Sequence, residues 1–287
     1  DDLLEVVQMV HDLAEGDEAR AILRFHAAEL MRTRVGEVER SIETYESVLE
    51  VLPDHEGSLG ALRAIVDEGE PFDRLTAARA LRPRYEARSD DAGLLAVLEV
   101  IAGLGDAVER LGALRRAAEV ADTRLSDAEK AYGFAARAVR AGTTEPDLDY
   151  LVGEAERHAA AAGRFAELAV LLADVAPEIG DPDLQIDTYR KVAELARGRL
   201  EDAPRARSYY EKILEVRPDH AGALNALEEM TSEAGDDVGL LDVLARKAEG
   251  ATGAERVALM MRQADLLESK LEEPARAIDA LEEALLT

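Results

Sequence analysis

The side chains best suited to catalysis or metal binding are scarce in this chain of 287 residues and do not form a known site. Cysteine is absent, which excludes disulfides, zinc–thiolate centres and a cysteine nucleophile. The histidines form no HExxH motif, and no two of them have the four-residue spacing that lets one helix chelate a metal. They are His11, His26, His55, His158 and His220. We therefore predict a protein that is not an enzyme, holds no metal and uses no cofactor.

Two weaker chemical signals deserve an interpretation. Asp181, Asp183 and Asp187 have part of the spacing of a calcium-binding loop, but the central glycine and the closing glutamate of such a loop are missing. His55 and His220 each follow a Pro-Asp pair, so they are either ligands or switches, or turn residues copied with a repeat. The turn interpretation is the simpler one. The sequence has no phosphate-binding glycine loop and no GxSxG motif.

Acidic residues dominate the charge: 61 Asp and Glu against 34 Lys and Arg give a formal net charge of −27. Such a field opposes binding to nucleic acid or to an anionic membrane. No window approaches the roughly 18 apolar residues of a membrane span, and with 47% hydrophobic residues the chain is too apolar for a disordered acidic tail. We predict a folded protein without membrane insertion. Its alanine-rich, lysine-poor composition is typical of a GC-rich bacterial gene. We expect the bacterial cytoplasm, with the periplasm left open because the absence of cysteine fits both compartments.

The chain contains internal repeats with a period of about 72 residues, the length of two helix pairs. Residues 20–62 align without a gap on residues 185–227. One further copy lies 75 residues before the second of these segments, and another lies 71 residues after it. Three of the copies share equivalent residues at these offsets: Ala118, Leu125 and Ala131 in one, Ala193, Leu200 and Ala206 in the next, and Ala264, Leu271 and Ala277 in the last.

Within each copy the apolar residues follow the period of an α-helix. Ala206, Tyr210, Ile213 and Leu214 fall on one helix face. Prolines and capping residues mark the helix ends, as at Pro218. Because no alternating apolar–polar run is long enough for a strand, the sequence predicts an all-α protein with about fifteen or sixteen helices.

Residues 200–218 resemble the second helix of a tetratricopeptide repeat (TPR). Ala206 takes the small position at the helix crossing, Tyr210 the aromatic position, Ile213 a packing position and Pro218 the terminal proline. Residues 36–53 fit the same signature with Ser41, Tyr45, Val48 and Pro53. The resemblance implies a right-handed superhelical solenoid of antiparallel helix pairs with a concave groove. It implies a single array over residues 1–287, clearest at 17–53, 106–142, 182–218 and 253–287.

One segment departs from the TPR pattern. Ser41 and Ala131 take equivalent positions but lie 90 residues apart, so we expect an extra, irregular helix at about residues 71–88. Pro83 falls inside this helix and is expected to break or kink it.

The TPR resemblance also implies which side chains of the first helices face the groove. The hypothetical binding residues are Phe25, Glu29, Arg32, Arg115, Glu119, Asp122, Arg190, Glu194, Arg197, Met261, Asp265 and Glu268. One position is acidic in all four copies: Glu29, Glu119, Glu194 and Asp265. These four groove carboxylates favour a basic or amphipathic partner. Alternatively, they are ordinary helix charges paired four residues along, as Arg115 with Glu119 and Arg190 with Glu194.

The sequence thus predicts a non-catalytic scaffold that binds a protein, peptide or helical partner through the groove. The alternative is a structural spacer or self-assembling segment of a larger bacterial assembly, without a dedicated groove. Leu281, Ala284 and Leu285 are expected to lack a following helix, and Leu3–Val7 begin inside a repeat motif. Both ends are therefore expected to be cut from a longer array, which makes the chain a fragment of a longer protein, or else to bury their apolar faces in contacts between copies, where open ends stack head to tail.

Overall fold

The computed structural model describes residues 14–286, and in that range it contains fifteen α-helices, α2 to α16, and no strand. This confirms the all-α prediction. His11 and the motif Leu3–Val7 lie outside the described residues, so the predicted N-terminal end stays a prediction. The described chain divides into two compact units: unit 1 holds residues 14–142 and 150–162, and unit 2 holds residues 143–149 and 163–286. None of the described helices has the length and apolarity needed to cross a bilayer.

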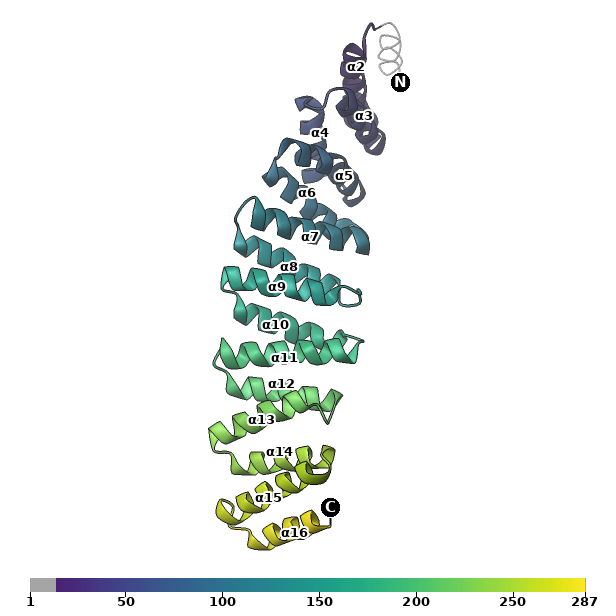
Figure 1. Ribbon diagram of the computed structural model, residues 1–287. Helices are drawn as coiled ribbons and strands as arrows, with labels where there is room; N and C mark the ends of the chain where they lie inside the picture. The colour runs from purple at the N-terminus through teal and green to yellow at the C-terminus, as the bar shows by residue number, and fades with distance from the viewer. Residues whose placement is uncertain (1–13, 287) are drawn as a thin grey trace. The chain divides into compact units, whose positions relative to one another are not determined.

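In unit 1 each helix from α2 to α8 packs against its neighbour in the chain (Figure 1). Its helices are α2 (Asp17–Leu30), α3 (Val38–Val51), α4 (Glu56–Glu68), α5 (Pro71–Arg88), α6 (Asp91–Leu104), α7 (Ala107–Thr123), α8 (Ala128–Ala141) and most of α9 (Leu148–Ala162). A π-helical turn, Met31–Val35, extends α2.

Unit 2 is built in the same way. Its helices are α10 (Phe165–Val175), α11 (Pro182–Gly198), α12 (Ala203–Val216), α13 (Ala221–Ala234), α14 (Asp237–Gly250), α15 (Gly253–Ser269) and α16 (Pro274–Leu285). A 3₁₀ turn, Ala176–Glu178, follows α10.

The loops inside three helix pairs repeat in their hydrogen bonding. The α7–α8, α11–α12 and α15–α16 loops each end with one backbone hydrogen bond of 2.8 Å, from Asp127 to Ala121, Asp202 to Ala196 and Glu273 to Leu267. Each loop also holds a non-glycine residue in the left-handed region: Ser126, Glu201 and Glu272, with φ of 52°, 54° and 56°. Because that conformation costs an ordinary residue about 1 kcal/mol or more, its recurrence shows that the sequence repeats are structural repeats.

Alanine supplies the close contacts between paired helices. Ala193 and Ala196 of α11 and Ala206 of α12 are fully buried in one core cluster with Tyr210 and Ile213. A methyl side chain lets two helix backbones approach, and the larger residues then fill the space beside them. This explains how a chain with 4% aromatic residues fills such a core cluster.

The irregular segment is a helix that Pro83 does not break. Helix α5 runs from Pro71 to Arg88 with Pro83 in its interior, so the expected break is wrong. Leu81 and Tyr85, on either side of the proline, are 0% and 3% exposed. Burial of these large side chains outweighs the backbone hydrogen bond that proline removes, which costs about 3 kcal/mol. The order of the elements shows the irregularity. Two helices, α4 and α5, separate α3 from α6, whereas α13 alone separates the equivalent helices α12 and α14.

His55 and His220 are helix N-caps. The Nδ1 atom of His55 accepts a hydrogen bond from the Ser58 backbone N–H at 3.1 Å, and Nδ1 of His220 accepts one from Ala223 at the same distance. Each imidazole thus satisfies one of the N–H groups that a helix start leaves unpaired. The turn interpretation of these residues therefore matches the geometry.

Replacing the His220 cap tests this assignment. His220→Ala should lower the free energy of unfolding by about 1 kcal/mol, because it leaves the Ala223 N–H without a side-chain acceptor. His220→Asp restores an acceptor and should recover most of the loss. Urea unfolding followed by circular dichroism measures both variants, and equal destabilisation by Ala and Asp would contradict the cap.

Candidate functional site

The twelve predicted groove residues belong to four helices of the two units. Unit 1 holds those of α2, with Arg32 in the π-helical turn that extends it, and those of α7; unit 2 holds those of α11 and α15. The two units therefore present separate sets of these residues, and the four helices differ in what their groove residues contact.

On α2 the predicted groove residues are engaged within unit 1. Tyr45 donates a short hydrogen bond to Glu29 Oε1, and Arg32 donates to Glu29 Oε2 at 3.0 Å. Phe25 packs edge-on against the His55 ring, with 4.7 Å between ring centroids. Burial favours a raised pKa for the Glu29 carboxyl, but the hydrogen bonds from Tyr45 and Arg32 outweigh it and the pKa is lowered.

On α11 the predicted residues form ion pairs. The expected Arg190–Glu194 pair is present at 2.6 Å, and Arg190 also binds Asp187. Arg197 reaches Glu229 and Glu233 of α13, at 2.8 and 2.9 Å. On α15, by contrast, Met261, Asp265 and Glu268 all lie exposed at the surface.

On α7 the expected Arg115–Glu119 pairing is replaced. Glu119 pairs with Arg116, three residues earlier, at 2.7 Å, while the Arg115 guanidinium lies 5.1 Å from the centre of the Tyr150 ring. A cation over an aromatic face is attracted by the ring quadrupole. Arg115 is thereby drawn toward α9, away from its own helix.

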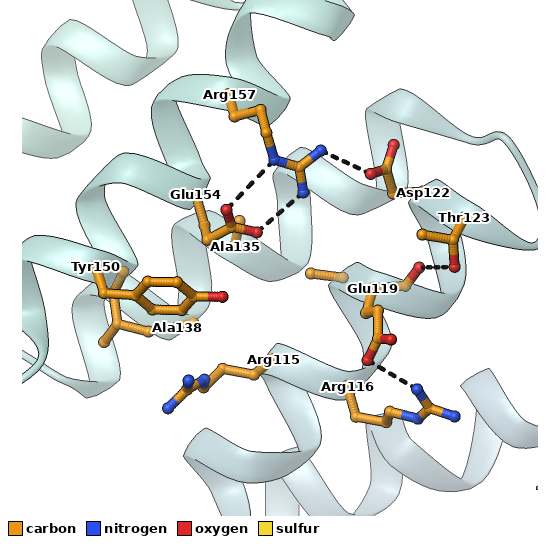
Figure 2. Close-up of a pocket in the computed structure, with 12 residues that line it drawn as sticks. Arg115, Arg116, Glu119, Asp122, Thr123, Ala135, Ala138, Tyr150, Glu154 and Arg157 are labelled. Carbon is orange, nitrogen blue, oxygen red and sulfur yellow. Dashed lines mark hydrogen bonds and ion pairs between the residues drawn. The ribbon is translucent and has the colours of Figure 1, made fainter.

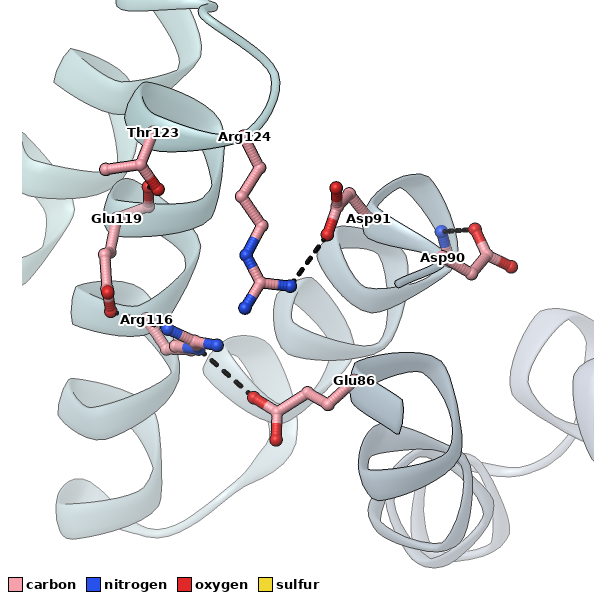
Figure 3. Close-up of polar contacts among 8 residues, drawn as sticks. Glu86, Asp90, Asp91, Arg116, Glu119, Thr123 and Arg124 are labelled. Carbon is pink, nitrogen blue, oxygen red and sulfur yellow. Dashed lines mark hydrogen bonds and ion pairs between the residues drawn. The ribbon is translucent and has the colours of Figure 1, made fainter. Parts of the chain in front are cut away.

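Arginines also link α7 to its neighbours, which the sequence analysis did not predict. Arg116 reaches Glu86 of α5 at 3.1 Å and Arg124 reaches Asp91 of α6 at 2.9 Å (Figure 3). These partners are 30 and 33 residues apart, close to the length of one helix pair. Opposite charges at that spacing are the sequence signal that would have found them.

A cleft lies between α7 and α9 in unit 1, with α8 as its floor (Figure 2). Its volume is about 260 Å³. The floor is apolar and buried, and consists of Ala135 and Ala138 of α8 with the adjoining Ala118 of α7 and Leu151 of α9. The rim is polar and consists of Arg115, Arg116, Glu119, Asp122, Thr123, Tyr150, Glu154 and Arg157. The cleft thus brings together the three predicted groove residues of α7.

Arg157 connects the two walls of the cleft. It binds Glu154 on its own helix at 2.9 Å and Asp122 of α7 at 2.7 Å. The hydrogen bond from Arg157 holds the pKa of the Asp122 carboxyl below its usual range, so this carboxylate stays charged. Three arginines and three carboxylates line the rim, so their formal charges cancel, unlike those of the whole chain.

The cleft exists because small residues replace large ones at repeated positions. Ala135 lies 75 residues before Tyr210, the offset between these two copies, and Tyr45 is the matching residue of α3. Tyr45 and Tyr210 are buried, at 0% and 7% exposure. Ala138 in the same way replaces Ile213. The volume that the chain's own tyrosine fills in two other copies is therefore open above Ala135.

His158 lies beside the rim residue Arg157 and is 1% exposed. Arg157 donates to His158 Nε2 at 2.9 Å, so in the neutral ring the proton is on Nδ1, which has no partner among the described residues. Burial and the neighbouring Arg157 cation lower the pKa of His158.

No group of three potential metal ligands occurs in the part of the chain that the structure describes. No protein-family model matches the chain, and no curated protein is similar to it. Any assignment of function therefore starts from the geometry of the cleft and from the repeats.

The Tyr45 hydrogen bonds can be measured against a matched residue. Tyr45→Phe should destabilise the chain by about 1.5–3 kcal/mol, because Glu29 loses a partner in a partly buried charged network. Tyr210→Phe should cost less than about 1 kcal/mol, since the Tyr210 hydroxyl makes no hydrogen bond to a described residue. Chemical unfolding of both variants checks the contrast. Equal losses of unfolding free energy in the two variants would show that the Tyr45–Glu29 hydrogen bond does not stabilise the fold.

His158 should make stability depend on pH. Because its folded-state pKa is lowered, the unfolded chain takes up the proton first. The contribution of His158 to the free energy of unfolding is complete above the unfolded-state pKa of about 6.5. It falls by at most about 1.4 kcal/mol per pH unit as the pH drops toward the folded-state pKa. Urea unfolding at about pH 7.5 and about pH 5.5 should show a smaller fall for His158→Gln than for the unaltered chain. The same fall in both would contradict the assignment.

Proposed function

We propose that this chain is a non-catalytic interaction scaffold that binds a peptide or helical partner. In this proposal the helix pairs form a right-handed, TPR-like solenoid, and the first helices of the pairs face the partner. The TPR-like signature of residues 200–218 and the recurring loops of three helix pairs support it. Stacked helix pairs suit such a role because their exposed first helices offer a rigid extended surface.

The α7–α9 cleft is the observation that carries the proposal. It combines a buried apolar floor with a charged rim, the arrangement that binding sites commonly show. Its volume of about 260 Å³ is below the roughly 300–1,000 Å³ of small-molecule pockets. A cleft of this size suits one large side chain of a peptide whose backbone lies along the rim.

The groove carboxylates contribute unequally to this proposal. Glu29 is committed to Tyr45 and Arg32, whereas the Glu119 side chain is 58% exposed at the rim of the cleft. A partner that contacts unit 1 would therefore meet Glu119 more readily than Glu29, or than Asp122, which binds Arg157 and is 27% exposed. Preference for a basic or amphipathic partner rests mainly on Glu119 in unit 1.

A structural spacer or self-assembling segment is the second candidate, and the surface of α16 favours it. Ile278, Leu281 and Leu285 are 56%, 43% and 87% exposed. The residues that match Leu281 and Leu285 in α12 are Tyr210 and Leu214, which are buried in the core cluster shared with α13. Exposed apolar faces of this kind favour association.

Ala284 does not share this exposure. It is 9% exposed and packs in a cluster with Leu259 and Met260 of the preceding helix, α15. Its position on the helix faces α15, whereas Leu285 points to the uncovered side.

Selection of peptides from a displayed library tests the scaffold function. The proposal predicts peptides that bind with Kd of about 1–100 µM and lose at least about tenfold in affinity on Ala138→Leu, which fills the cleft floor. Ala166→Leu, at an exposed position of α10, is the matched control and should change nothing. Isothermal titration calorimetry measures both variants.

Light scattering over a range of concentrations separates the second candidate. The scaffold function would be contradicted if the protein selects no binding peptide and instead forms assemblies whose mass increases with concentration. Such growth should then be lost on Leu285→Lys, since this change puts a charge on the uncovered face of α16.

A further inference from the structure

The contacts of Tyr45 show what a side chain in the α7–α9 cleft would meet. In unit 1 the Tyr45 ring is fully buried, and its hydroxyl donates to Glu29 Oε1 while Arg32 holds Oε2. Glu29 precedes Tyr45 by 16 residues. The same spacing separates Glu119 from Ala135, so Glu119 is the equivalent acceptor at the copy that lacks the tyrosine.

Glu119 shares with Glu29 an arginine bound to one carboxylate oxygen, but not the position of that arginine. Arg116, three residues before Glu119, donates to Glu119 Oε2 at 2.7 Å, whereas Arg32 follows Glu29 by three residues and donates to its Oε2 at 3.0 Å. The Oε1 atom of Glu119 has no hydrogen-bond partner among the described residues. The acceptor that Tyr45 uses in one copy is thus present, oriented by an arginine and open in the other.

The remaining walls suit an aromatic ring. Ala135 and Ala138, each 3% exposed, leave an apolar floor, and Tyr150 lies at one side with its hydroxyl end directed toward the middle of the cleft (Figure 2). A pair of aromatic rings gains free energy beyond that of the apolar surface it buries. The rim charges cancel, so a neutral polar tip fits better than a charged one.

We propose that the α7–α9 cleft binds a tyrosine side chain of a partner peptide, with its ring over Ala135 and its hydroxyl donating to Glu119. The partner's tyrosine then occupies the volume that Tyr45 and Tyr210 fill from within the chain. This inference rests on the proposed scaffold function, because it names the side chain that such a partner inserts.

The first test uses p-cresol, which has the chemistry of a tyrosine side chain, and toluene, which lacks only the hydroxyl. Titration of the ¹⁵N-labelled chain, followed by NMR, should shift the amide signals of α7, α8 and α9. We expect p-cresol to bind about tenfold tighter than toluene, as expected for a hydrogen bond to a charged acceptor. Shifts elsewhere, or equal affinities, would overturn the proposal.

Two variants locate the binding. Glu119→Met removes the acceptor and should bring the affinities for p-cresol and toluene within about twofold, whereas Glu43→Met, at an exposed position of α3, should leave the tenfold difference intact. Ala135→Tyr fills the cleft from within and should abolish p-cresol binding. Should Ala135→Tyr fail to fold, the Glu119→Met comparison still decides.

Peptide selection distinguishes this inference from the scaffold function. Selected peptides should contain tyrosine, and its replacement by phenylalanine should cost about tenfold in affinity. Peptides that bind without an aromatic residue, or that prefer phosphotyrosine, would overturn the inference and leave the scaffold function standing. A chain that binds p-cresol in the cleft but selects no peptide would overturn the scaffold function.

Discussion

Burial of each helix against its neighbours in the sequence is the constraint on which both units depend. A helix in such a stack cannot cover its own apolar face. The side chain at each position of that face must therefore have a size that fits the surface of the next helix. The chain meets this demand with alanines such as Ala193 and Ala206, and with a few large residues such as Tyr210 between them. Where the large residue is missing, as at Ala135, the stack leaves a cleft. The packing of the helices and the cleft therefore arise from the same pattern of small and large side chains.

Arginine side chains hold many of the surface carboxylates in fixed positions. The chain has 34 basic residues against 61 acidic ones, and Arg116, Arg157 and Arg197 each bind two carboxylates. An exposed ion pair stabilises a fold by only about 0–1 kcal/mol. Its larger effect here is on position, since Arg157 fixes the separation of Asp122 and Glu154 across the cleft. The rim is thus ordered and electrically balanced within a strongly acidic chain.

Sequence alone predicted the helical class and the repeated positions, because helix period and loop signals are local. The break expected at Pro83 was wrong, because burial of Leu81 and Tyr85 outweighs the local preference of proline, while the alternative of a kink stays a prediction. Sequence alone also missed the link between Arg157 and Asp122, since that pair depends on the packing of two helices. The cleft was within reach of the sequence: Ala135 breaks the series formed by Tyr45 and Tyr210. Only the structure shows that Tyr150 and Arg157 leave that volume open.

A crystal structure of the Ala135→Tyr variant tests most directly whether the cleft is an unfilled tyrosine position. The account predicts that the introduced ring lies over Ala138 between α7 and α9, with its hydroxyl within about 3 Å of Glu119 Oε1. The backbones of α7 and α8 should keep their positions. An introduced ring that points into solvent, or one that enters only by pushing α7 and α9 apart, would contradict it.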